Sequence, residues 1–434
     1  MTAPLPRALQ AYRLALSAAA PLTPLLLRQR LVRGKEIDER LCERRGEGKL
    51  PRPDGPLVWL HAASVGEVMS VLPLIERISD RGLTMLVTSG TVTSSEIAAQ
   101  RMPPGVIHQF VPLDVPSFVE RFLDRWRPQL ALFVESDLWP NLLIETARRD
   151  VPLVLLNARL SERSFRRWQR LPQFIGHLLQ GFDLCLARTR ADAERLTQLG
   201  GRKVVVSGNL KLDVPAPPAD APALAALQDA VGSRPVMAAA STHPGEDELV
   251  IAAHKRLRAD MPGLLTLIAP RHPERGPQIA ALASAAGLTA AVRSESALPN
   301  AATDIYVADT MGELGLLYRL TPVVFIGGSL IPHGGQNPIE AAKLGTAIVH
   351  GPHVANFQEL YAELDAANGA ELVADGDRLA ATLGALLTQP ILRERMARAG
   401  HDVVEALGGA LERTMQGLEP YLDPLQHRQG AHHA

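Results

Sequence analysis

The sequence has few cysteines, few aromatic residues and no excess of charge of either sign. Its two cysteines, Cys42 and Cys185, are too few for a disulfide framework or a four-thiolate metal site, and they suit a reducing compartment. Aromatic residues make up 4% of the chain, which argues against a platform for stacking bases. The 45 Lys and Arg residues are balanced by 46 Asp and Glu residues, so no overall field attracts nucleic acid. We therefore expect no nucleic-acid partner.

The common nucleotide and metal motifs are also missing. The chain contains neither GxxxxGK[ST] nor a well-placed GxGxxG, which argues against a P-loop or a dinucleotide site. Its histidines form no HExxH and no other short ligand pair with supporting carboxylates. His350 and His353 lie three residues apart, but the Gly-Pro between them is typical of a loop. We expect no metal site.

Long apolar runs are absent too, and the nearest approach to one is at the N-terminus. Residues 8–27 are apolar but interrupted by Arg13, Pro21 and Pro24, so the stretch is too broken for a transmembrane helix. Basic residues follow this stretch instead of preceding it, unlike the order in a cleaved signal peptide. Two interpretations remain: a helix packed on the protein's own domain, or a helix lying on an anionic membrane surface.

The rest of the chain alternates short apolar runs with longer helix-like stretches. Nearly continuous apolar strands separated by helices indicate parallel sheets covered on both faces. The runs of strand length are 57–64, 84–90, 129–136, 152–158, 183–189, 203–209, 235–241, 264–270, 289–294, 304–310, 322–329, 346–352 and 370–375. The pattern predicts two doubly wound α/β domains, which we expect to face each other across an interdomain cleft.

Composition places the domain boundaries. A Pro/Ala stretch without apolar periodicity, residues 214–223, is predicted to be a linker between an N-terminal domain over 36–213 and a C-terminal domain over 224–425. The remaining parts are a membrane-associating segment, 1–35, and a tail expected to be disordered, 426–434.

Carboxylates follow two predicted strands of the N-terminal domain. Glu67 begins the helix after the first strand, where it either complements the helix dipole or acts as a general base. Glu135 and Asp137 follow a buried strand, and in an extended chain they would point the same way and need a cation between them. Lys211, just after another strand, is a candidate for that cation.

The C-terminal domain carries groups suited to anions at the ends of its strands. Ser241 and Thr242 offer hydroxyls at a strand–helix junction, and Arg271 follows the next strand, where it can bind a phosphate or carboxylate in two places. Gly-rich turns flank a short loop over 327–338, and Glu340 near the following helix start is suited to ribose hydroxyls. Each of these signals is common in α/β proteins.

Taken together, several strings resemble the 3-deoxy-D-manno-octulosonic acid (Kdo) transferases of lipopolysaccharide synthesis, from about Arg40 to about Phe357. The strings are HAASVGEV, FVPLDVP, ESDLWPN, NARLSERS, GNLKLD, ASTHPGE, APRHPER, DTMGELGLLY and GGSLIPHGGQNPIEAA. The resemblance implies a GT-B glycosyltransferase fold, an inverting mechanism without metal or other cofactor, CMP-Kdo as donor and a lipid A precursor (lipid IVA) as acceptor. It also implies work at the cytoplasmic face of the bacterial inner membrane, and thus favours a membrane role for residues 1–35.

The resemblance also assigns roles by motif position. Glu67 would be the general base, and Glu135 and Lys211 would support the transition state. The implied CMP-binding segments contain Pro270, Arg271, Met311, Gly312, Glu313, Asn337, Pro338, Ile339 and Glu340. Two departures from the family pattern leave acceptor contacts open: Asp137 replaces a more usual Glu, and residues 88–96 differ from the usual string.

Two other functions fit the same residues less well. One is a GT-B transferase or epimerase that uses a different nucleotide sugar, such as a UDP-linked one, or a different acceptor. The other is a membrane-associated binding protein that has kept the fold and lost catalysis, which the presence of Glu67, Glu135, Lys211 and Arg271 disfavours.

Overall fold

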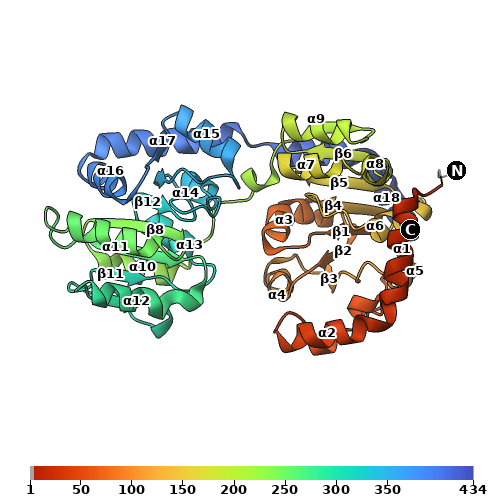
Figure 1. Ribbon diagram of the computed structural model, residues 1–434, viewed down its shortest axis with the longest axis horizontal. Helices are drawn as coiled ribbons and strands as arrows, with labels where there is room; N and C mark the ends of the chain where they lie inside the picture. The colour runs from red at the N-terminus through yellow and green to blue at the C-terminus, as the bar shows by residue number, and fades with distance from the viewer. Residues whose placement is uncertain (1–3, 434) are drawn as a thin grey trace. The chain divides into compact units, whose positions relative to one another are not determined.

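The computed structural model describes the backbone of residues 4–433 and the side chains of residues 4–427 (Figure 1). It divides into two compact units, each built around one parallel sheet. Unit 1 contains the described residues up to Val214 together with those from Gly408 onward, and unit 2 contains Pro215–Leu407.

Unit 1 has a seven-stranded sheet in the order β3-β2-β1-β4-β5-β6-β7, with every neighbouring pair parallel. The strands are apolar along most of their length, as expected when both faces are covered. They are β1 (Leu57–His61), β2 (Thr84–Ser89), β3 (Ile107–Phe110), β4 (Leu130–Val134), β5 (Leu153–Ala158), β6 (Leu184–Ala187) and β7 (Val204–Val206).

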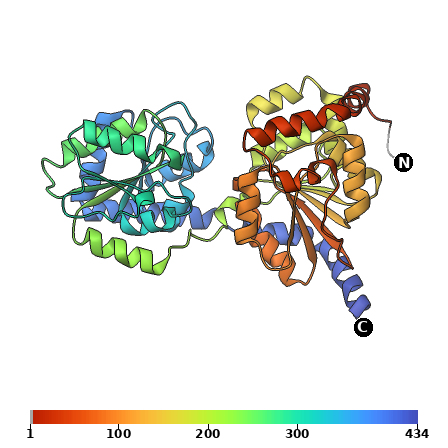
Figure 2. The same cartoon turned by 90° about the horizontal axis from the view of Figure 1, so that it is seen from below.

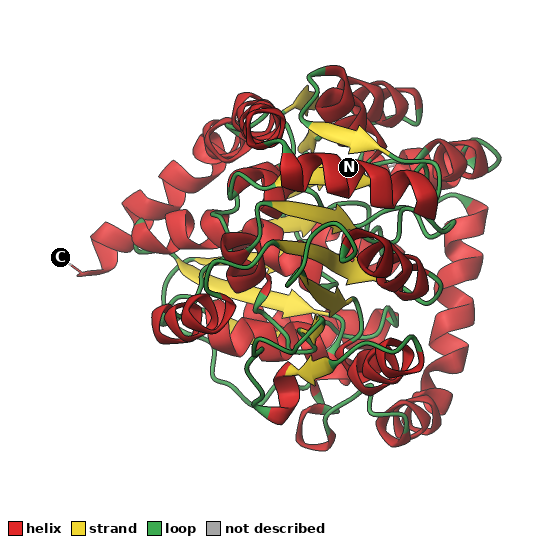
Figure 3. Ribbon diagram, turned by 90° about the vertical axis from the view of Figure 1, so that its left-hand side faces the viewer, coloured by secondary structure: helices red, strands yellow, loops and turns green. Residues whose placement is uncertain are grey.

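Helices cover both faces of this sheet, and two separate apolar cores result. Figure 3 shows the helices and strands of both units, coloured by type. Trp59 and Phe133 point into one core, and their sequence neighbours Val58 and Leu132 point into the other, as the alternation along a strand requires. The α-helices are α1 (Arg7–Ala19), α2 (Thr23–Val32), α3 (Val65–Asp80), α4 (Val92–Arg101), α5 (Pro116–Trp126), α6 (Pro140–Arg148), α7 (Glu162–Trp168), α8 (Pro172–Leu179), α9 (Arg190–Gln198) and α18 (Ala410–His433). Short 3₁₀ turns are η1 (Ala20–Leu22), η2 (Asp38–Arg40), η3 (Glu43–Arg45) and η4 (Leu210–Leu212).

Unit 2 repeats this plan with a seven-stranded parallel sheet in the order β10-β11-β9-β8-β12-β13-β14. Its strands are β8 (Val236–Thr242), β9 (Leu265–Pro270), β10 (Ala290–Val292), β11 (Ile305–Val307), β12 (Val323–Ile326), β13 (Ala347–His350) and β14 (Ala370–Leu372). Its helices are α10 (Ala221–Val231), α11 (Glu246–Leu257), α12 (Gly276–Ala285), α13 (Leu314–Leu320), α14 (Ile339–Lys343), α15 (Gln358–Ala366), α16 (Gly376–Thr388) and α17 (Pro390–Ala406), with 3₁₀ turns η5 (Pro273–Arg275) and η6 (Arg293–Glu295). The predicted pair of doubly wound α/β domains is confirmed.

Each strand predicted from an apolar run is present, and β3 is the one strand that was not predicted among residues 4–433. The interior of β3 carries His108 and Gln109, which hide the apolar pattern of a buried strand. Both side chains have partners inside the protein: His108 Nε2 lies 2.9 Å from Ser89 Oγ, and Gln109 Oε1 accepts from Trp126 Nε1 at 2.9 Å. Such partners remove the cost of burying polar groups, so a strand forms without an apolar run.

The predicted end of the C-terminal domain at 425 is wrong, because α18 belongs to unit 1. The apolar face of α18 packs into a core of the first sheet through Met415, Leu418, Leu422 and Leu425. Figure 2 shows this helix, in blue, lying with the red-to-yellow unit. Burial of four large side chains explains the assignment. The tail expected to be disordered is helical through His433, and residue 434 lies outside the described residues.

The predicted linker and the predicted membrane-associating segment both contain helices. The unit boundary falls at 214/215 within the predicted linker 214–223, but α10 already begins at Ala221. In the segment 1–35, α1 packs on unit 1 and places Leu9 fully inside a core, while residues 1–3 lie outside the described residues. Over residues 4–433, none of the helices is both long enough and apolar enough to cross a bilayer.

We predict that Leu422→Ala destabilises unit 1 selectively. Leu422 is fully buried, and deleting such a side chain costs about 2–5 kcal/mol through lost burial and a residual cavity. All four tryptophans (59, 126, 139 and 168) lie in unit 1, so tryptophan fluorescence during urea unfolding reports on that unit. The midpoint should fall in Leu422→Ala and stay unchanged in the control Leu50→Ala, whose leucine is exposed. An unchanged midpoint in both variants would contradict the packing of α18 on this unit.

Candidate functional site

The candidate site of unit 1 lies at the carboxyl edge of its sheet, where the order of the strands reverses. β1 and β4 are neighbours in the sheet but not in the sequence, and ligands of doubly wound folds bind at such switch points. Glu67 follows β1 and Glu135 follows β4. The predicted carboxylates therefore flank the position where a ligand is expected.

Glu67 stands in the first turn of α3, where it completes a capping arrangement. Ser64, the N-cap residue, accepts from the Glu67 amide at 3.4 Å and donates its hydroxyl to Glu67 Oε1 at 2.8 Å. Glu67 Oε2 accepts from the Ala63 amide at 2.8 Å. Glu67 therefore helps to cap α3, and both of its oxygens keep lone pairs that could take a proton.

The surroundings of Glu67 favour its protonated form. Burial raises the pKa of this carboxyl, while the hydrogen bonds from Ser64 and Ala63 act in the opposite direction. The negative charges of Glu135 and Asp137 add to the rise. A carboxylate whose pKa is raised above its usual range is a stronger base than an ordinary glutamate, which suits general-base catalysis.

Glu135 is held at the end of β4 in an unusual backbone conformation. Its φ is 60°, in the left-handed region, while its amide continues the sheet by donating to the Leu156 carbonyl at 2.8 Å. Its Oε1 accepts from Lys211 Nζ at 2.7 Å, with both side chains partly exposed. The predicted pairing of Glu135 with Lys211 is confirmed.

Asp137 has a different partner. Its Oδ2 lies 3.0 Å from His61 Nε2, and the other ring nitrogen of His61 lies 3.0 Å from Thr88 Oγ1. The chain is not extended at Glu135, whose backbone is left-handed, and the two carboxylates have separate cationic or imidazole partners instead of sharing one cation. Burial opposes ionisation of Asp137, but the hydrogen bond with His61 and the charge of that ring hold its pKa below the usual range.

Lys211 reaches Glu135 because two asparagines fix η4. Asn209 caps the turn by accepting from the Lys211 amide at 3.2 Å. Asn157 Oδ1, at the end of β5, accepts from the Leu210 amide at 3.1 Å. The sequence analysis missed Asn157, although an Asn with left-handed backbone at a strand end (φ 50°) is a recognisable signal once the fold is known.

The candidate site of unit 2 occupies the equivalent edge of its sheet, at the switch between β8 and β12. The chain after β12 packs tightly on the chain after β8: a Cβ on Gly327 would lie 2.5 Å from the Ser241 carbonyl oxygen. Only glycine allows this approach. Ser241 itself has a left-handed φ of 57° and is partly exposed.

A buried carboxylate that the sequence analysis gave no role, Glu246, organises this edge. It is fully buried, and its oxygens accept from four backbone amides: His243 at 3.0 Å, Gly328 at 2.6 Å, and Ser329 and Leu330 at 3.0 Å each. The Gly-rich turn therefore already surrounds an internal anion. Its amides at 328–330 hold the protein's own carboxylate, as a nest of N–H groups would hold a ligand.

Thr242, predicted to hold a donor phosphate, has an internal partner instead. Its side chain is fully buried and its hydroxyl donates to Asp247 Oδ1 at 2.7 Å. Arg275 also pairs with Asp247 and donates to the Thr242 carbonyl at 3.2 Å. This arrangement leaves the Thr242 hydroxyl no free direction toward a ligand, so the structure assigns it to supporting the turn.

Arg271 has the opposite character, because its side chain is exposed and makes no hydrogen bond or ion pair within the described residues. Its backbone amide donates to the Thr242 carbonyl at 3.0 Å, which fixes the chain after the buried Pro270 against β8. An unpaired guanidinium on a fixed backbone can bind a phosphate or carboxylate in two places.

A stack of imidazoles lies beside this arginine. The rings of His243 and His333 stack with their centroids 3.8 Å apart, and Gln336 Nε2 lies 3.0 Å from His243 Nε2. Burial, followed by the neighbouring positive charges, lowers the pKa of His243 to about 4. This ring is therefore neutral near pH 7, and the positive charge of the edge comes from arginine.

In the predicted segment 311–313, two residues are exposed and the third is hydrogen-bonded inside unit 2. Met311 and Gly312 are exposed. Glu313 receives a bidentate pair from Arg293, at 3.1 and 2.8 Å, and also a hydrogen bond from Thr310. The contact with Arg293 is the main cause that holds the pKa of Glu313 below its usual range. Its charge is neutralised inside unit 2.

The last predicted segment begins α14. Asn337 Oδ1 accepts from the Ile339 amide at 3.0 Å, while Pro338 and Ile339 are buried. Glu340 is partly buried, and burial raises its pKa although the hydrogen bond with Asn337 opposes the rise. Of these four residues, Asn337 and Glu340 present polar side chains that a ligand can reach. Among residues 4–427, no group of three or more His, Cys, Asp or Glu side chains is placed to hold a metal ion.

We predict that Glu246→Gln loosens the loop after β12. Glutamine keeps the size of the side chain but points an NH₂ group at amides that need an acceptor, so some of the four contacts are lost. Hydrogen exchange of the amides at 328–330 should become faster than in the native protein. The control Glu248→Gln, which changes an exposed carboxylate that accepts from the Gly245 amide, should leave those amides unaffected. Native-like exchange in Glu246→Gln would show that the loop does not depend on this charge.

Comparison with known proteins places these two sites in context. A family model for 3-deoxy-D-manno-octulosonic-acid transferase (kdotransferase) matches residues 35–214. The 3-deoxy-D-manno-octulosonic acid transferase of Bordetella pertussis is 38% identical over 424 residues, covering 95% of this chain and 99% of that protein. The corresponding protein of Haemophilus influenzae is 35% identical over 401 residues, covering 90% of this chain and 93% of that protein.

The similarity to a solved structure concerns the fold and not the function. The glycosyltransferase from Rickettsia africae ESF-5 matches 85% of this chain and 99% of its own chain, with a TM-score of 0.59 at 11% sequence identity. At that identity the likeness concerns the architecture alone. Together with the two parallel sheets, it identifies the fold as the GT-B type of glycosyltransferases. The identity to the Bordetella and Haemophilus proteins, over nearly their whole length, shows that the chain belongs to the 3-deoxy-D-manno-octulosonic acid (Kdo) transferase family.

Proposed function

We propose that this Kdo transferase moves Kdo from CMP-Kdo to a lipid A precursor, lipid IVA, with inversion at the anomeric carbon and Glu67 as general base. The observation that carries the proposal is the position of Glu67. Its carboxylate lies at the switch point of unit 1, near a second carboxylate that is paired with a lysine, and its pKa is raised. Family membership supplies the class of reaction.

The reaction is a single displacement with Glu67 as the proton acceptor. An acceptor hydroxyl oxygen forms a bond to the anomeric carbon, and its proton passes to Glu67. The bond between that carbon and the phosphate oxygen of CMP breaks, and the electron pair leaves with CMP. Attack on the side opposite the leaving group inverts the anomeric centre.

Glu135 and Lys211 support this step by electrostatics. Their 2.7 Å pair keeps the lysine charge at the carboxyl edge of the sheet. A fixed charge of this kind stabilises charge that develops during transfer, and it needs no reorganisation at that moment. Burial is the main cause of the raised pKa of Glu67, and the charge of Glu135 adds to it.

Unit 2 supplies the groups that we assign to CMP. Arg271 is exposed and unpaired among the described residues. Ser241, near the end of the neighbouring strand β8, is partly exposed. Met311, Gly312, Asn337 and Glu340 offer the remaining reachable contacts, with Glu340 suited to ribose hydroxyls. We propose that the reaction needs no metal, because the leaving group departs as a phosphate that is already stabilised by charge and can be held by arginine and backbone N–H groups.

The N-terminal helices provide a surface suited to the inner membrane. Five large apolar side chains on α1, η1 and α2 are exposed: Leu14, Leu22, Leu25, Leu26 and Val32. Three exposed cations follow or flank them: Arg28, Arg33 and Lys35. Apolar side chains next to cations favour an anionic lipid surface. We therefore place the protein at the cytoplasmic face of the bacterial inner membrane, in contact with the bilayer surface.

We predict that Glu67→Gln abolishes transfer and keeps the fold. Glutamine still completes the capping arrangement with Ser64, but it cannot take a proton from the acceptor. Mass spectrometry of lipid IVA incubated with CMP-Kdo in detergent should show product with the native protein and none with the variant. In the native protein the acid limb of kcat/KM should lie above the ordinary pKa of glutamate, because the base must lose its proton and its pKa is raised.

Nucleotide binding provides the control for this prediction. CMP should raise the melting temperature of the native protein and of Glu67→Gln alike, whereas UDP should not. Near-native turnover in the variant would show that another group is the base. Protection by UDP and not by CMP would instead favour a different nucleotide sugar.

We also predict that Leu25→Ser weakens binding to vesicles with anionic lipid. Leu25 is 71% exposed, so its burial in the headgroup region is worth roughly 1–2 kcal/mol, or about a tenfold change in partitioning. Cosedimentation with vesicles measures the change. Leu298→Ser, which alters an exposed leucine of unit 2, serves as the matched control, and an equal loss in both variants would argue against α2 as the contact.

A further inference from the structure

The start of α6 determines where the loop with Glu135 and Asp137 ends. This loop, residues 135–139, runs directly into Pro140, the first residue of the helix. The N-cap residue Trp139 makes no side-chain cap, and Pro140 has no N–H. The first amides of α6 therefore need an acceptor from elsewhere in the fold.

Asp114, distant in the sequence, is that acceptor. Its Oδ2 accepts from the Asn141 amide at 3.1 Å and its Oδ1 from the Leu142 amide at 2.9 Å. Its backbone carbonyl accepts from Asn141 Nδ2 at 2.5 Å. Asp114 lies between β3 and α5 and is 7% exposed, so its carboxylate is a built-in cap that also complements the dipole of α6.

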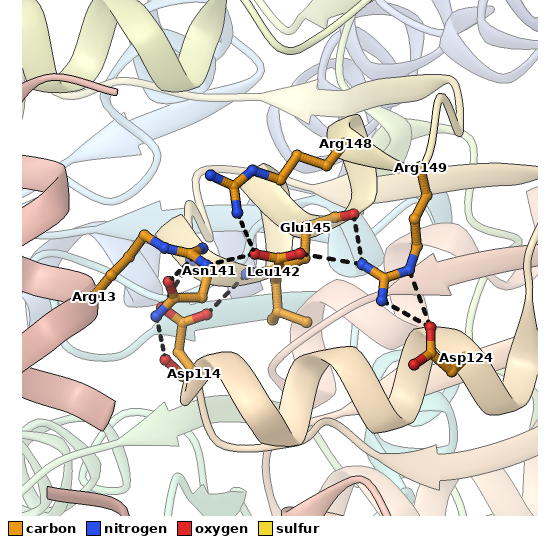
Figure 4. Close-up of polar contacts among 8 residues, drawn as sticks. All are labelled: Arg13, Asp114, Asp124, Asn141, Leu142, Glu145, Arg148 and Arg149. Carbon is orange, nitrogen blue, oxygen red and sulfur yellow. Dashed lines mark hydrogen bonds and ion pairs between the residues drawn. The ribbon is translucent and has the colours of Figure 1, made fainter. Parts of the chain in front are cut away.

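The N-terminal helix reaches the same point (Figure 4). Tyr12 of α1 donates its hydroxyl to Asp114 Oδ2 at 2.9 Å. The next residue, Arg13, donates to Asn141 Oδ1 at 3.1 Å and to Glu145 Oε1 at 2.6 Å. We call Tyr12, Arg13, Asp114 and Asn141 the α1–α6 latch.

The polar contacts continue from Glu145 along α6 to α5. Glu145 also accepts from Arg148 at 3.0 Å and from Arg149 at 3.1 Å, and Arg149 in turn pairs with Asp124 of α5 at 2.7 Å. Figure 4 shows these contacts as one chain of polar groups from α1 to α5. The body of α6 is held by Leu143 and Ile144, which are buried in a core of unit 1, and by the pair of Arg149 with Asp124. Loss of the latch should therefore release the first turn and the preceding loop before it releases the helix.

We propose that Asp114 is a positioning residue for the transfer reaction and that Tyr12 and Arg13 hold it in place. By fixing the first turn of α6, the latch sets the positions of Glu135 and Asp137. The inference rests on the proposed role of Glu135 in catalysis. It gives α1 a second task, since the helix supports the active edge as well as carrying exposed apolar side chains.

A helix that only tethers the protein to a membrane would behave differently. Its loss would matter for vesicle-bound acceptor and not for acceptor dispersed in detergent. A helix that positions the loop matters in both cases, because the contacts lie inside unit 1. The two roles are therefore separated by measuring turnover in detergent, where tethering contributes nothing.

Tyr12→Phe and Asp114→Asn test the proposal, with Arg77→Gln as control. Tyr12→Phe removes one hydroxyl and keeps the ring that packs edge-on against Phe174. Arg77 forms an exposed ion pair with Glu412 on a different part of unit 1. Hydrogen exchange of residues 135–142 should become faster in both latch variants and stay native in the control. This readout requires no activity, so it tests the latch even if the proposed reaction is wrong.

Kinetics in detergent then test the link to catalysis. We expect kcat to fall about tenfold or more in each latch variant with the KM for CMP-Kdo unchanged, since small displacements of catalytic groups cost such factors. The acid limb of kcat/KM should move to lower pH, because Glu135 and Asp137 move away from Glu67. The double variant should lose little more than either single one, as expected for groups that act as a unit.

Three results would overturn the proposal. Native exchange at 135–142 in both variants would show that the latch does not hold the loop. Faster exchange with native kcat and an unmoved acid limb would show that the loop position does not matter for transfer. If the melting temperature falls in the latch variants and equally in Arg77→Gln, and nothing else changes, then the latch contributes only to overall stability. If Asp114→Asn does not fold, Tyr12→Phe decides the matter by the same measurements.

Discussion

The constraint on which both units depend is the need to satisfy backbone N–H groups at the carboxyl edge of a parallel sheet. Each strand there turns into a helix whose first amides have no partner within the helix. In this protein, N-cap serine and threonine side chains supply some of the acceptors, and carboxylates supply others. Glu246 receives four amides in unit 2, and Asp114 receives two in unit 1. The same requirement brings Glu67 to the first turn of α3.

This solution concentrates carboxylates at the candidate sites, and the two units balance their charge differently. In unit 1, Lys211 and His61 each take one carboxylate, and Glu67 is left with a raised pKa. In unit 2, Glu246 is satisfied by backbone amides, and the side chain of Arg271 is exposed. The proposed function assigns a base to one unit and a cation to the other, which suits transfer from an anionic donor to a hydroxyl.

Much of the architecture was predictable from local pattern. Apolar runs with helical stretches between them indicated every strand except β3, whose His108 and Gln109 are polar. The charge of Lys211 and its place after a strand made it a candidate partner for the carboxylates, and it pairs with Glu135. The predictions failed where a distant contact decided the outcome. Thr242 was predicted to bind phosphate, but its hydroxyl donates to Asp247. The residues of α18 up to 425 were assigned to the second domain, but their leucines lie in a core of unit 1.

The sequence was therefore sufficient for the fold class, the family and the residue types at the strand ends, because these depend on periodicity and on short motifs. It was insufficient for Glu246, Asn157 and Asp114, which act on backbone groups far away in the chain. A carboxylate or an amide in a loop has many possible partners. Only the packing of the sheet and its helices selects one of them, because a hydrogen bond requires two groups within about 3 Å.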